Sequence, residues 1–321
     1  MVKTHLRLNA ALVEQARDVI RPFLPPTRLM PTRLAGNRRV FLKVEADQPT
    51  GSFKVRGALS NLLRQPANET GFVTASAGNH GLGVAWAAKA SGRRERVTIF
   101  IPRSAPQTKV GKFRQYAVDL RIAGETFEDA ERLAREFERE TGARYIHAYD
   151  DPLTAAGQGT LALEIRDAMS AADPIGTLVV PVGGGGMISG NAAWFKERFP
   201  ATRIVAVQAD ASPSLSESIR LGRALLEYPA GPTLADGLSG GIGRIVFEHR
   251  DLLDEVVNVP EERIIAAVRA LYLEDRVRAE ASGAITVAAL DLVQSRSWPE
   301  PIVCVISGGN IDDSVFEPIV A

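Results

Sequence analysis

The sequence has very little cysteine and no excess of charge of either sign. Its 321 residues include one cysteine, Cys304, so neither an intrachain disulfide nor a cysteine-based zinc site can form, and a reducing, cytoplasmic setting is expected. The 38 basic and 38 acidic side chains cancel, which argues against nucleic acid or an anionic membrane surface as a partner. The longest apolar runs fall short of the ~18 residues that a membrane span needs. The first residues lack the apolar core of a secretory signal.

Lysine is also scarce. Only seven of the 38 basic residues are lysines, so few residues are candidates for chemistry at an amine. They are Lys3, Lys43, Lys54, Lys89, Lys109, Lys112 and Lys196. Apolar residues make up 45% of the chain and charged residues 24%, so the sequence can form a sizeable core in one large domain or two ordinary ones.

Short β-rich runs alternate with longer amphipathic stretches. The runs predict strands at residues 40–44, 72–75, 97–101, 120–123, 178–182, 204–208 and 302–306. The stretches predict helices at residues 10–20, 81–90, 128–140, 154–169, 188–199 and 261–278. Several strands are apolar throughout, as in sheets covered on both faces, so the pattern favours an α/β fold with mostly parallel sheets. Turn-forming residues near 66–71 and 149–152 predict crossings between two domains.

Four consecutive glycines at positions 183–186 follow one of these strands, and Met187 opens the next helix. Glycine backbone can approach an anion closely, and the helix N-terminus adds its positive end, so the loop is a candidate phosphate site. The alternative is a tight turn between strand and helix. Met187 and Ile188 stand where a Walker loop needs Lys and Ser or Thr. The third glycine of the dinucleotide-binding pattern is missing. The acidic residue that such a site needs at the end of the next strand is present as Asp210, so a nicotinamide dinucleotide stays an open alternative.

Lys54 lies in a turn that follows a strand and opens a helix. Its neighbours Phe53 and Val55 are apolar, and burial among apolar groups lowers the pKa of a lysine. A neutral amine is nucleophilic, so Lys54 is a candidate for covalent catalysis. The alternative is a surface lysine at the start of a helix.

Two more polar turns also follow strands. At residues 74–81, small residues expose backbone donors that suit a carboxylate. By themselves, Asn79 would be a helix cap and His80 a packing histidine. The turn at residues 307–310 follows the last strand, and by itself it is an ordinary turn.

In this order, the turns resemble the serine/threonine dehydratase family, which are pyridoxal-phosphate enzymes of the tryptophan-synthase-β fold type (fold type II). The likeness rests on Ser-Phe-Lys-Val-Arg-Gly-Ala at residues 52–58, Ser-Ala-Gly-Asn-His at 76–80, the four glycines, and Ser-Gly-Gly-Asn at 307–310. It extends to His147 and to residues 150–152, 156–160 and 235–238. It implies two α/β domains, each an open, mostly parallel twisted sheet flanked by helices. Residues 1–70 and 148–321 would form the large cofactor domain, and residues 71–147 the small domain that carries the substrate-carboxylate loop.

The resemblance implies pyridoxal phosphate as cofactor and a set of residues that hold it. Lys54 would form the Schiff base, Phe53 would lie against the pyridine ring, and Asn79 would hydrogen-bond the ring hydroxyl. Ser307 would meet the pyridine nitrogen, and Glu280 would lie near the ring. The phosphate would be held by backbone N–H groups of Gly183, Gly184, Gly185, Gly186 and Met187. A serine hydroxyl cannot keep the nitrogen charged, and the resulting weaker electron sink suits elimination better than transamination.

The resemblance also implies which residues face the substrate. The loop that takes the substrate carboxylate would consist of Ser76, Ala77, Gly78, Asn79 and His80. Racemases of the family carry a serine where this sequence has Ala77, so a second base is missing and racemisation is disfavoured. Tyr149 stands where relatives often have Phe or Asn beside the substrate, so the side-chain pocket is not necessarily that of threonine.

Two other departures concern a metal site and a regulatory domain. The family's divalent-cation site uses a glutamate where this sequence has Gln208, which leaves Asp210 as the nearby acidic residue, so we expect no metal site. The chain ends 11 residues after Asn310. We therefore expect the C-terminal regulatory domain of biosynthetic threonine deaminases to be absent.

The sequence thus predicts a cytoplasmic, homodimeric ammonia-lyase that acts on a small amino acid. It would eliminate water from a β-hydroxy-α-amino acid of the L-threonine or L-serine type to give a 2-oxo acid and ammonia. One alternative is a dehydratase for a non-standard substrate, such as a hydroxyaspartate, phenylserine or a hydroxyectoine breakdown product, or a β-replacement synthase of the same fold type. Another is a non-catalytic or nicotinamide-binding α/β protein. The sequence does not name the substrate side chain.

Overall fold

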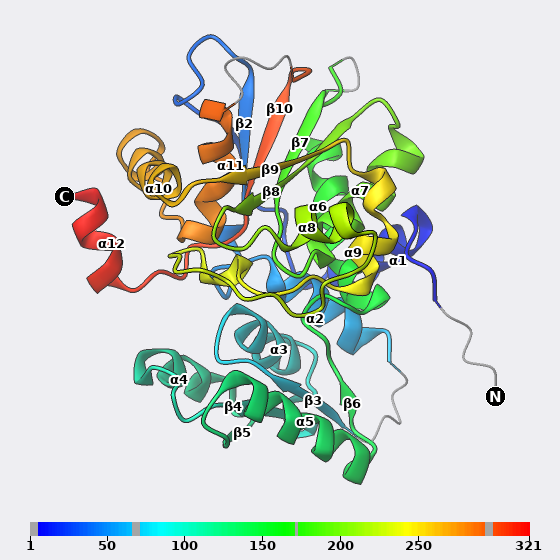
Figure 1. The fold of residues 1–321 in the computed structure, drawn as a ribbon. Coiled ribbons are helices and arrows are strands. Elements are labelled where there is room, and N and C mark those ends of the chain that lie inside the picture. The colour runs from blue at the N-terminus through cyan, green and yellow to red at the C-terminus, as the bar shows by residue number, and fades with distance from the viewer. Residues whose placement is uncertain (1–5, 66–70, 171–172, 293–297) are drawn as a thin grey trace.

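The computed structural model describes residues 6–65, 71–170, 173–292 and 298–321 (Figure 1). These residues form an α/β structure with one six-stranded and one four-stranded sheet. The predicted fold class, α/β with mostly parallel sheets flanked by helices, is therefore confirmed. Apart from Gly71, the crossing predicted at residues 66–71 lies outside the described residues. The domain boundaries stay a prediction.

The larger sheet unites both ends of the chain. In spatial order its strands are β1 (Leu29–Pro31), β2 (Val40–Val44), β10 (Ile302–Ile306), β7 (Thr177–Pro181), β8 (Arg203–Ala209) and β9 (Glu255–Val259). Neighbouring strands are parallel except for β1 and β2. Because β2, β10 and β7 lie side by side and parallel, the loops that follow them meet at one edge of the sheet. These loops carry Lys54, Ser307 and the four glycines.

The smaller sheet is built from one continuous part of the chain. Its strands, in spatial order, are β5 (Asp119–Ile122), β4 (Val97–Ile101), β3 (Phe72–Ala75) and β6 (Arg144–Tyr145), all parallel. Alternate residues point to opposite faces. Phe72 and Ile99 therefore pack in one core with the helix that follows β3, whereas Val73 and Phe100 pack in another with the helix that precedes β6.

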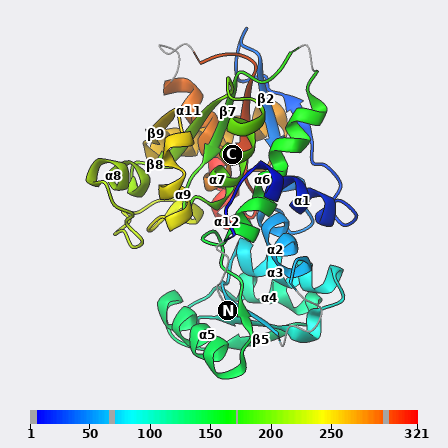
Figure 2. The ribbon, with the colours of Figure 1, turned by 90° about the vertical axis from the view of Figure 1, so that its right-hand side faces the viewer.

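Helices cover both faces of the larger sheet, and two of them lie between the two sheets. They are α1 (Ala10–Ile20), α2 (Lys54–Leu63), α3 (Asn79–Ala90), α4 (Gln107–Phe113), α5 (Phe127–Thr141), α6 (Pro152–Ala168), α7 (Gly186–Arg198), α8 (Ser214–Leu221), α9 (Arg244–Glu248), α10 (Glu261–Asp275), α11 (Ala281–Leu292) and α12 (Asp313–Val320). α1, α6 and α7 pack on one face of the larger sheet, and α10 and α11 on the other. Figure 2 shows α2 and α3 between the two sheets. Of the helices in the described ranges, none is long and apolar enough to cross a membrane.

Every predicted helix and strand is present in the structure. One predicted helix extends too far, and several observed elements were not predicted. Each predicted strand agrees with the structure to within one residue at either end. The helix predicted to reach residue 278 ends at Asp275, because Arg276 has a left-handed backbone with φ of 56°. α11 was not predicted because residues 281–290 are all buried, so no polar face marks its helical period. The helices α4, α8, α9 and α12 and the short or edge strands β1, β6 and β9 were also missed.

Candidate functional site

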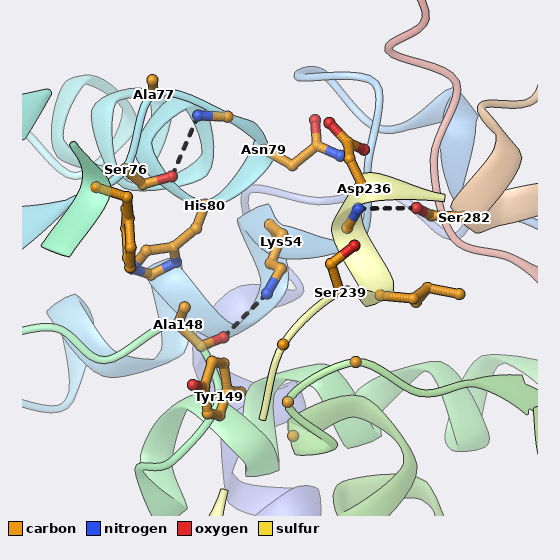
Figure 3. A pocket seen from close by; sticks show the side chains of 18 of the residues that line it. Lys54, Ser76, Ala77, Asn79, His80, Ala148, Tyr149, Asp236, Ser239 and Ser282 are labelled. Atoms are coloured by element: carbon orange, nitrogen blue, oxygen red, sulfur yellow. Dashed lines mark hydrogen bonds between the residues drawn. The ribbon is translucent and has the colours of Figure 1, made fainter. Parts of the chain in front are cut away.

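A cavity of about 1330 Å³ lies between the two sheets (Figure 3). It is lined by the loops that follow β2, β3, β7 and β10, together with the segment between β6 and α6. Every residue that the sequence analysis assigned to cofactor or substrate lines this cavity. The structure thus brings these residues together, while the role of each stays a prediction.

Lys54 is the first residue of α2, and its amine lies in the cavity. Its Nζ donates a hydrogen bond to the carbonyl oxygen of Ala148, 3.2 Å away (Figure 3). Burial lowers the pKa of the Lys54 amine to about 8, and the Glu280 carboxylate opposes this shift. A substantial fraction of the amine is therefore neutral at mildly alkaline pH, which is the state that attacks a carbonyl carbon.

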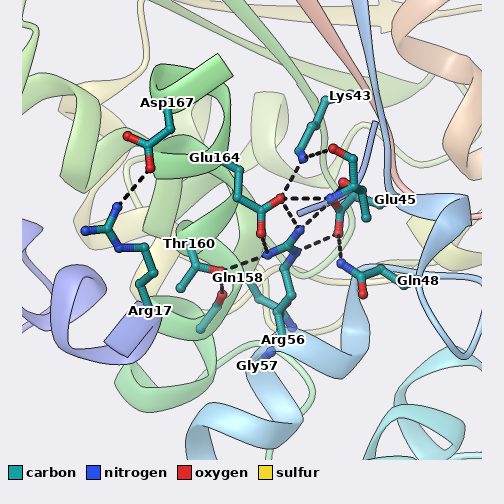
Figure 4. A network of polar contacts seen from close by, with 12 residues as sticks. Arg17, Lys43, Glu45, Gln48, Arg56, Gly57, Gln158, Thr160, Glu164 and Asp167 are labelled. Atoms are coloured by element: carbon teal, nitrogen blue, oxygen red, sulfur yellow. Dashed lines mark hydrogen bonds and ion pairs between the residues drawn. The ribbon is translucent and has the colours of Figure 1, made fainter. Parts of the chain in front are cut away.

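A buried ion network lies behind the first turn of α2 (Figure 4). Arg56 contacts Glu45 at 2.7 Å and Glu164 at 2.6 Å, and Lys43 contacts Glu164 at 2.6 Å. Burial alone would raise the pKa of Glu45, but Arg56, together with Lys43 and Thr27, outweighs it and lowers that pKa to about 2. Two cationic and two anionic groups therefore compensate one another inside the protein. Their contacts hold the helix that begins at Lys54.

The loop after β7 leaves no room for side chains. A Cβ on Gly183 would approach the carbonyl oxygen of Gly237 to 2.6 Å, and a Cβ on Gly185 would approach Val246 to 2.4 Å. Gly185 also has a φ of 86°, which favours glycine. α7 begins at Gly186, and the N–H groups of its first turn have no partner within the helix. This arrangement suits an anion held by backbone N–H groups.

Tyr149 forms the wall beside the next glycine of this loop. A Cβ on Gly184 would come within 2.3 Å of the Tyr149 ring. The ring also meets His147 edge to face, with ring centroids 4.6 Å apart. Burial raises the pKa of the Tyr149 hydroxyl, so the phenol is neutral at ordinary pH. The segment that connects the two sheets therefore packs directly on the glycine loop.

The loop between β3 and α3 is short and held at both ends. The Ser76 N–H donates to the carbonyl oxygen of Phe100 at 3.0 Å, and the Gly78 N–H donates to Ser76 Oγ at 3.2 Å. Asn79 begins α3 and donates from Nδ2 to Glu280 Oε1 at 2.8 Å. The small side chain of Ala77 lies between these anchored residues and lines the cavity. The loop therefore presents backbone groups and few side-chain atoms to a ligand.

His80 is buried beneath this loop. Its Nε2 lies 3.0 Å from Thr74 Oγ1 and 3.0 Å from the carbonyl oxygen of Ile146. Burial, reinforced by the charge of Lys54, lowers the pKa of His80 to about 3. The ring is therefore neutral at ordinary pH and joins the loop to the end of the smaller sheet.

Glu280 lies across the cavity from this loop. Burial and the nearby charge of Asp236 raise the pKa of Glu280 to about 7. Asn310 donates from Nδ2 to Asn79 Oδ1 at 2.7 Å, so Glu280, Asn79 and Asn310 form a connected group. Ser307, at the end of β10, is buried, and its carbonyl oxygen accepts a hydrogen bond from the Phe53 N–H at 3.0 Å.

The structure adds cavity residues that the sequence analysis did not assign. Lys109 reaches from α4 to within 3.6 Å of Asp236, and so joins the smaller sheet's side of the cavity to the larger. Glu131, on α5, accepts a hydrogen bond from the Tyr145 hydroxyl at 3.2 Å. Glu131 belongs to a predicted helix rich in charge, and Lys109 to a helix that was not predicted. In neither place does a sequence signal separate a cavity residue from a solvent-exposed one.

Comparisons with known proteins agree with this geometry. A profile of the family described as "Pyridoxal-phosphate dependent enzyme" matches residues 20–308. Over 321 residues, the chain is 37% identical to an L-threonine ammonia-lyase of Geobacter sulfurreducens, covering 98% of this chain and 78% of that protein. The structure resembles maize serine racemase with a TM-score of 0.89 at 33% identity, covering 98% of this chain and 97% of that one. The structure also resembles the processed form of threonine deaminase isoform 2 from Solanum lycopersicum, with a TM-score of 0.87 at 31% identity. This match covers 97% of this chain and 86% of that one.

Proposed function

Because the chain belongs to the family of pyridoxal-phosphate dependent enzymes, we propose that it is an ammonia-lyase of the serine/threonine dehydratase type. It eliminates water from a β-hydroxy-α-amino acid such as L-threonine or L-serine, and it releases a 2-oxo acid and ammonia. The observation that carries the proposal is the meeting of two features in one cavity: the Lys54 amine, with its pKa lowered to about 8, and the loop of four glycines. The relatives named as threonine ammonia-lyase and threonine deaminase support the reaction type.

The residues present fit pyridoxal phosphate. Gly183, Gly184, Gly185 and Gly186 each lack room for a Cβ, and α7 begins at Gly186. Their N–H groups and that of Met187 would surround a phosphate. Lys54 would bond covalently to the cofactor aldehyde, and Phe53, Asn79, Glu280 and Ser307 would contact the ring. When bound, the cofactor supplies the electron sink that makes the substrate Cα proton acidic.

The chain's own groups then have separate tasks. The N–H groups of the loop formed by Ser76, Ala77, Gly78, Asn79 and His80 bind and orient the substrate carboxylate. The Lys54 amine takes the proton from Cα. Tyr149 borders the place of the substrate side chain. The neutral Ser307 hydroxyl does not hold a positive charge on the ring nitrogen, which favours elimination over transamination.

Elimination is favoured over racemisation by one residue. Racemisation needs acid–base groups on both faces of Cα, and Ala77 supplies none on the face opposite Lys54. The structural likeness to a serine racemase is therefore compatible with a lyase, because a shared fold leaves the chemistry to individual side chains.

Three finer points belong to the same proposal. The substrate is a small amino acid. The alternatives are a non-standard β-hydroxy amino acid or β-replacement chemistry, since Tyr149 forms the wall beside Gly184 and the side-chain pocket is not necessarily that of threonine. The enzyme is a homodimer. It works in the cytoplasm, in keeping with its single buried cysteine.

One experiment tests the reaction and the lysine together. Purified enzyme with pyridoxal phosphate is assayed for 2-oxo acid release from a panel of β-hydroxy amino acids, and borohydride-treated enzyme is mapped by peptide mass spectrometry. We expect release from at least one member, and the reduced cofactor on Lys54. Lys54→Ala should abolish turnover, whereas Lys89→Ala, on the outside of α3, should not. Normal turnover by Lys54→Ala would contradict the proposal.

A further inference from the structure

The backbone on both sides of His147 is fixed. The Ile146 N–H donates to the Val73 carbonyl oxygen at 2.8 Å, and the Ile146 carbonyl oxygen accepts from Thr74 Oγ1 at 3.0 Å. On the other side, the Ala148 carbonyl oxygen accepts from Lys54 Nζ at 3.2 Å. His147 therefore lies one residue from the group that holds the lysine amine.

The tautomer of the His147 ring is also fixed. Nδ1 accepts hydrogen bonds from the backbone N–H groups of Asp150, at 2.9 Å, and Tyr149, at 3.3 Å. An acceptor nitrogen carries no proton, so the proton of the neutral ring is on Nε2. Burial lowers the pKa of His147, which keeps the ring neutral. Edge-to-face contacts with Tyr145 and Tyr149 hold its orientation.

The Nε2–H group of His147 is accessible and, among the described residues, unpartnered. Within the described part of the chain it has no hydrogen-bond partner, and it is not among the fully buried polar atoms that lack one. His147 lines the same cavity as Lys54. The nearby Glu131 carboxylate is engaged by the Tyr145 hydroxyl at 3.2 Å and by Arg135 at 4.0 Å. The ring thus holds one preoriented, accessible donor in the wall of the cavity that also contains the Lys54 amine.

We infer that His147 donates a hydrogen bond from Nε2–H to the leaving group on the substrate β carbon, an inference that rests on the proposed function. In the elimination, the Cα–H bond breaks and its proton passes to the Lys54 amine. The electron pair left at Cα forms the Cα=Cβ double bond. The Cβ–O bond breaks with its electron pair going to oxygen, and this oxygen takes a proton from the Lys54 ammonium to become water. His147 keeps its own proton throughout and stabilises the negative charge that develops on the oxygen. A preoriented hydrogen-bond donor is suited to this task.

A purely structural role is the competing explanation, because Nδ1 anchors the turn at Tyr149 and Asp150. Two variants separate the roles. His147→Asn keeps an acceptor close to the Nδ1 position and removes the Nε2 donor. His147→Gln carries an amide N–H close to the Nε2 position and loses the anchor. Thr74→Val is the matched control, since it removes a hydrogen bond to the same segment without touching the donor.

The test compares L-serine with β-chloro-L-alanine, which differ only in the leaving group. Hydroxide is a poor leaving group that needs a donor, whereas chloride leaves without one. For His147→Asn holoenzyme, we expect the ratio of kcat with L-serine to kcat with β-chloro-L-alanine to fall about 10-fold to 100-fold. His147→Gln should retain a higher ratio than His147→Asn. Thr74→Val should keep the ratio of the unmodified enzyme.

The outcomes distinguish this inference from the proposed function. If the unmodified enzyme releases no 2-oxo acid from either compound, the proposed function fails and the inference fails with it. If the unmodified enzyme is active and His147→Asn lowers both kcat values by the same factor, His147 is only a structural anchor and the inference alone is wrong.

Discussion

Asn79 donates a hydrogen bond to Glu280, with 2.8 Å between Nδ2 and Oε1, although the residues are 201 positions apart. Asn79 begins α3 beside the smaller sheet, and Glu280 directly precedes α11 on the larger sheet. The contact therefore joins the proposed carboxylate loop to the opposite wall of the cavity. An ionised Glu280 has a second carboxylate, Asp236, in its neighbourhood, so its charge is costly in the folded protein.

Glu280→Gln should change the pH dependence of stability. The folded-state pKa of Glu280 is raised to about 7 from 4.5, so between these values the folded protein holds a proton that the unfolded chain has lost. Stability is therefore lost as pH rises from about 4.5 to 7, by at most about 3 kcal/mol. Urea unfolding measures the free energy of unfolding of Glu280→Gln minus that of the unmodified protein. This difference should be more favourable to the variant at pH 8 than at pH 5. The control is Glu128→Gln at the exposed start of α5, and an equal difference at both pH values would contradict the prediction.

Gly184→Ala should impair cofactor binding. The added Cβ would lie 2.3 Å from the Tyr149 ring, so either the ring or the glycine loop must move. We expect the Kd for pyridoxal phosphate to rise at least about 10-fold, from loss of the N–H geometry that holds an anion. Fluorescence titration measures this. Gly111→Ala, in α4, is the control because its Cβ would meet nothing within 4 Å; equal effects of the two substitutions would show that the close contact is unimportant.

Ala77→Ser should raise racemisation. The unmodified enzyme has no hydroxyl at this position, so exchange of L-serine to D-serine should be negligible beside elimination. A serine at position 77, on the loop between Ser76 and Gly78, adds an acid–base group there. Chiral chromatography of the reaction mixture follows both enantiomers. Racemisation by the unmodified enzyme at rates that match elimination would refute the assignment of Ala77.

Activity should depend little on divalent metal. Gln208 is fully buried, and its Oε1 accepts the N–H groups of Leu215 at 3.0 Å and Ser216 at 3.2 Å. The amide therefore serves the first turn of α8, and a neutral amide is a poorer ligand than a carboxylate. Prolonged chelation should change turnover and Tm only slightly. A large loss, restored by magnesium or calcium but not by a monovalent salt of matched ionic strength, would reveal a metal site.

Arg56→Met should destabilise the protein strongly. It leaves the buried Glu45 carboxylate without its main partner, and breaking such a pair costs about 3–5 kcal/mol. Arg17→Met is the control, because the Arg17–Asp167 pair is partly exposed and such pairs contribute about 0–1 kcal/mol. Chemical denaturation compares the two variants. If the two variants lose similar free energies of unfolding, the network around Arg56 contributes no more to stability than a surface ion pair.

The sequence by itself determined the local architecture of the site. Apolar β-branched runs and helical periods located the strands and helices, because such patterns depend only on neighbouring residues. The glycines at positions 183–186 and the apolar neighbours of Lys54 marked two turns between strand and helix. Since the carboxyl ends of parallel strands meet at one edge, an α/β pattern already implied that loops of this kind would come together.

Only the tertiary structure decided which side chains meet. The contact of Tyr149 with Gly184, the bond from Lys54 to the Ala148 carbonyl oxygen and the bond between Asn79 and Glu280 join residues from different loops. They depend on the order of the strands, with β10 inserted between β2 and β7, and on how the smaller sheet lies against the larger. Long-range packing of this kind leaves no period in the sequence. The pKa of a buried group follows from the same packing, because desolvation and neighbouring charges are properties of the assembled cavity.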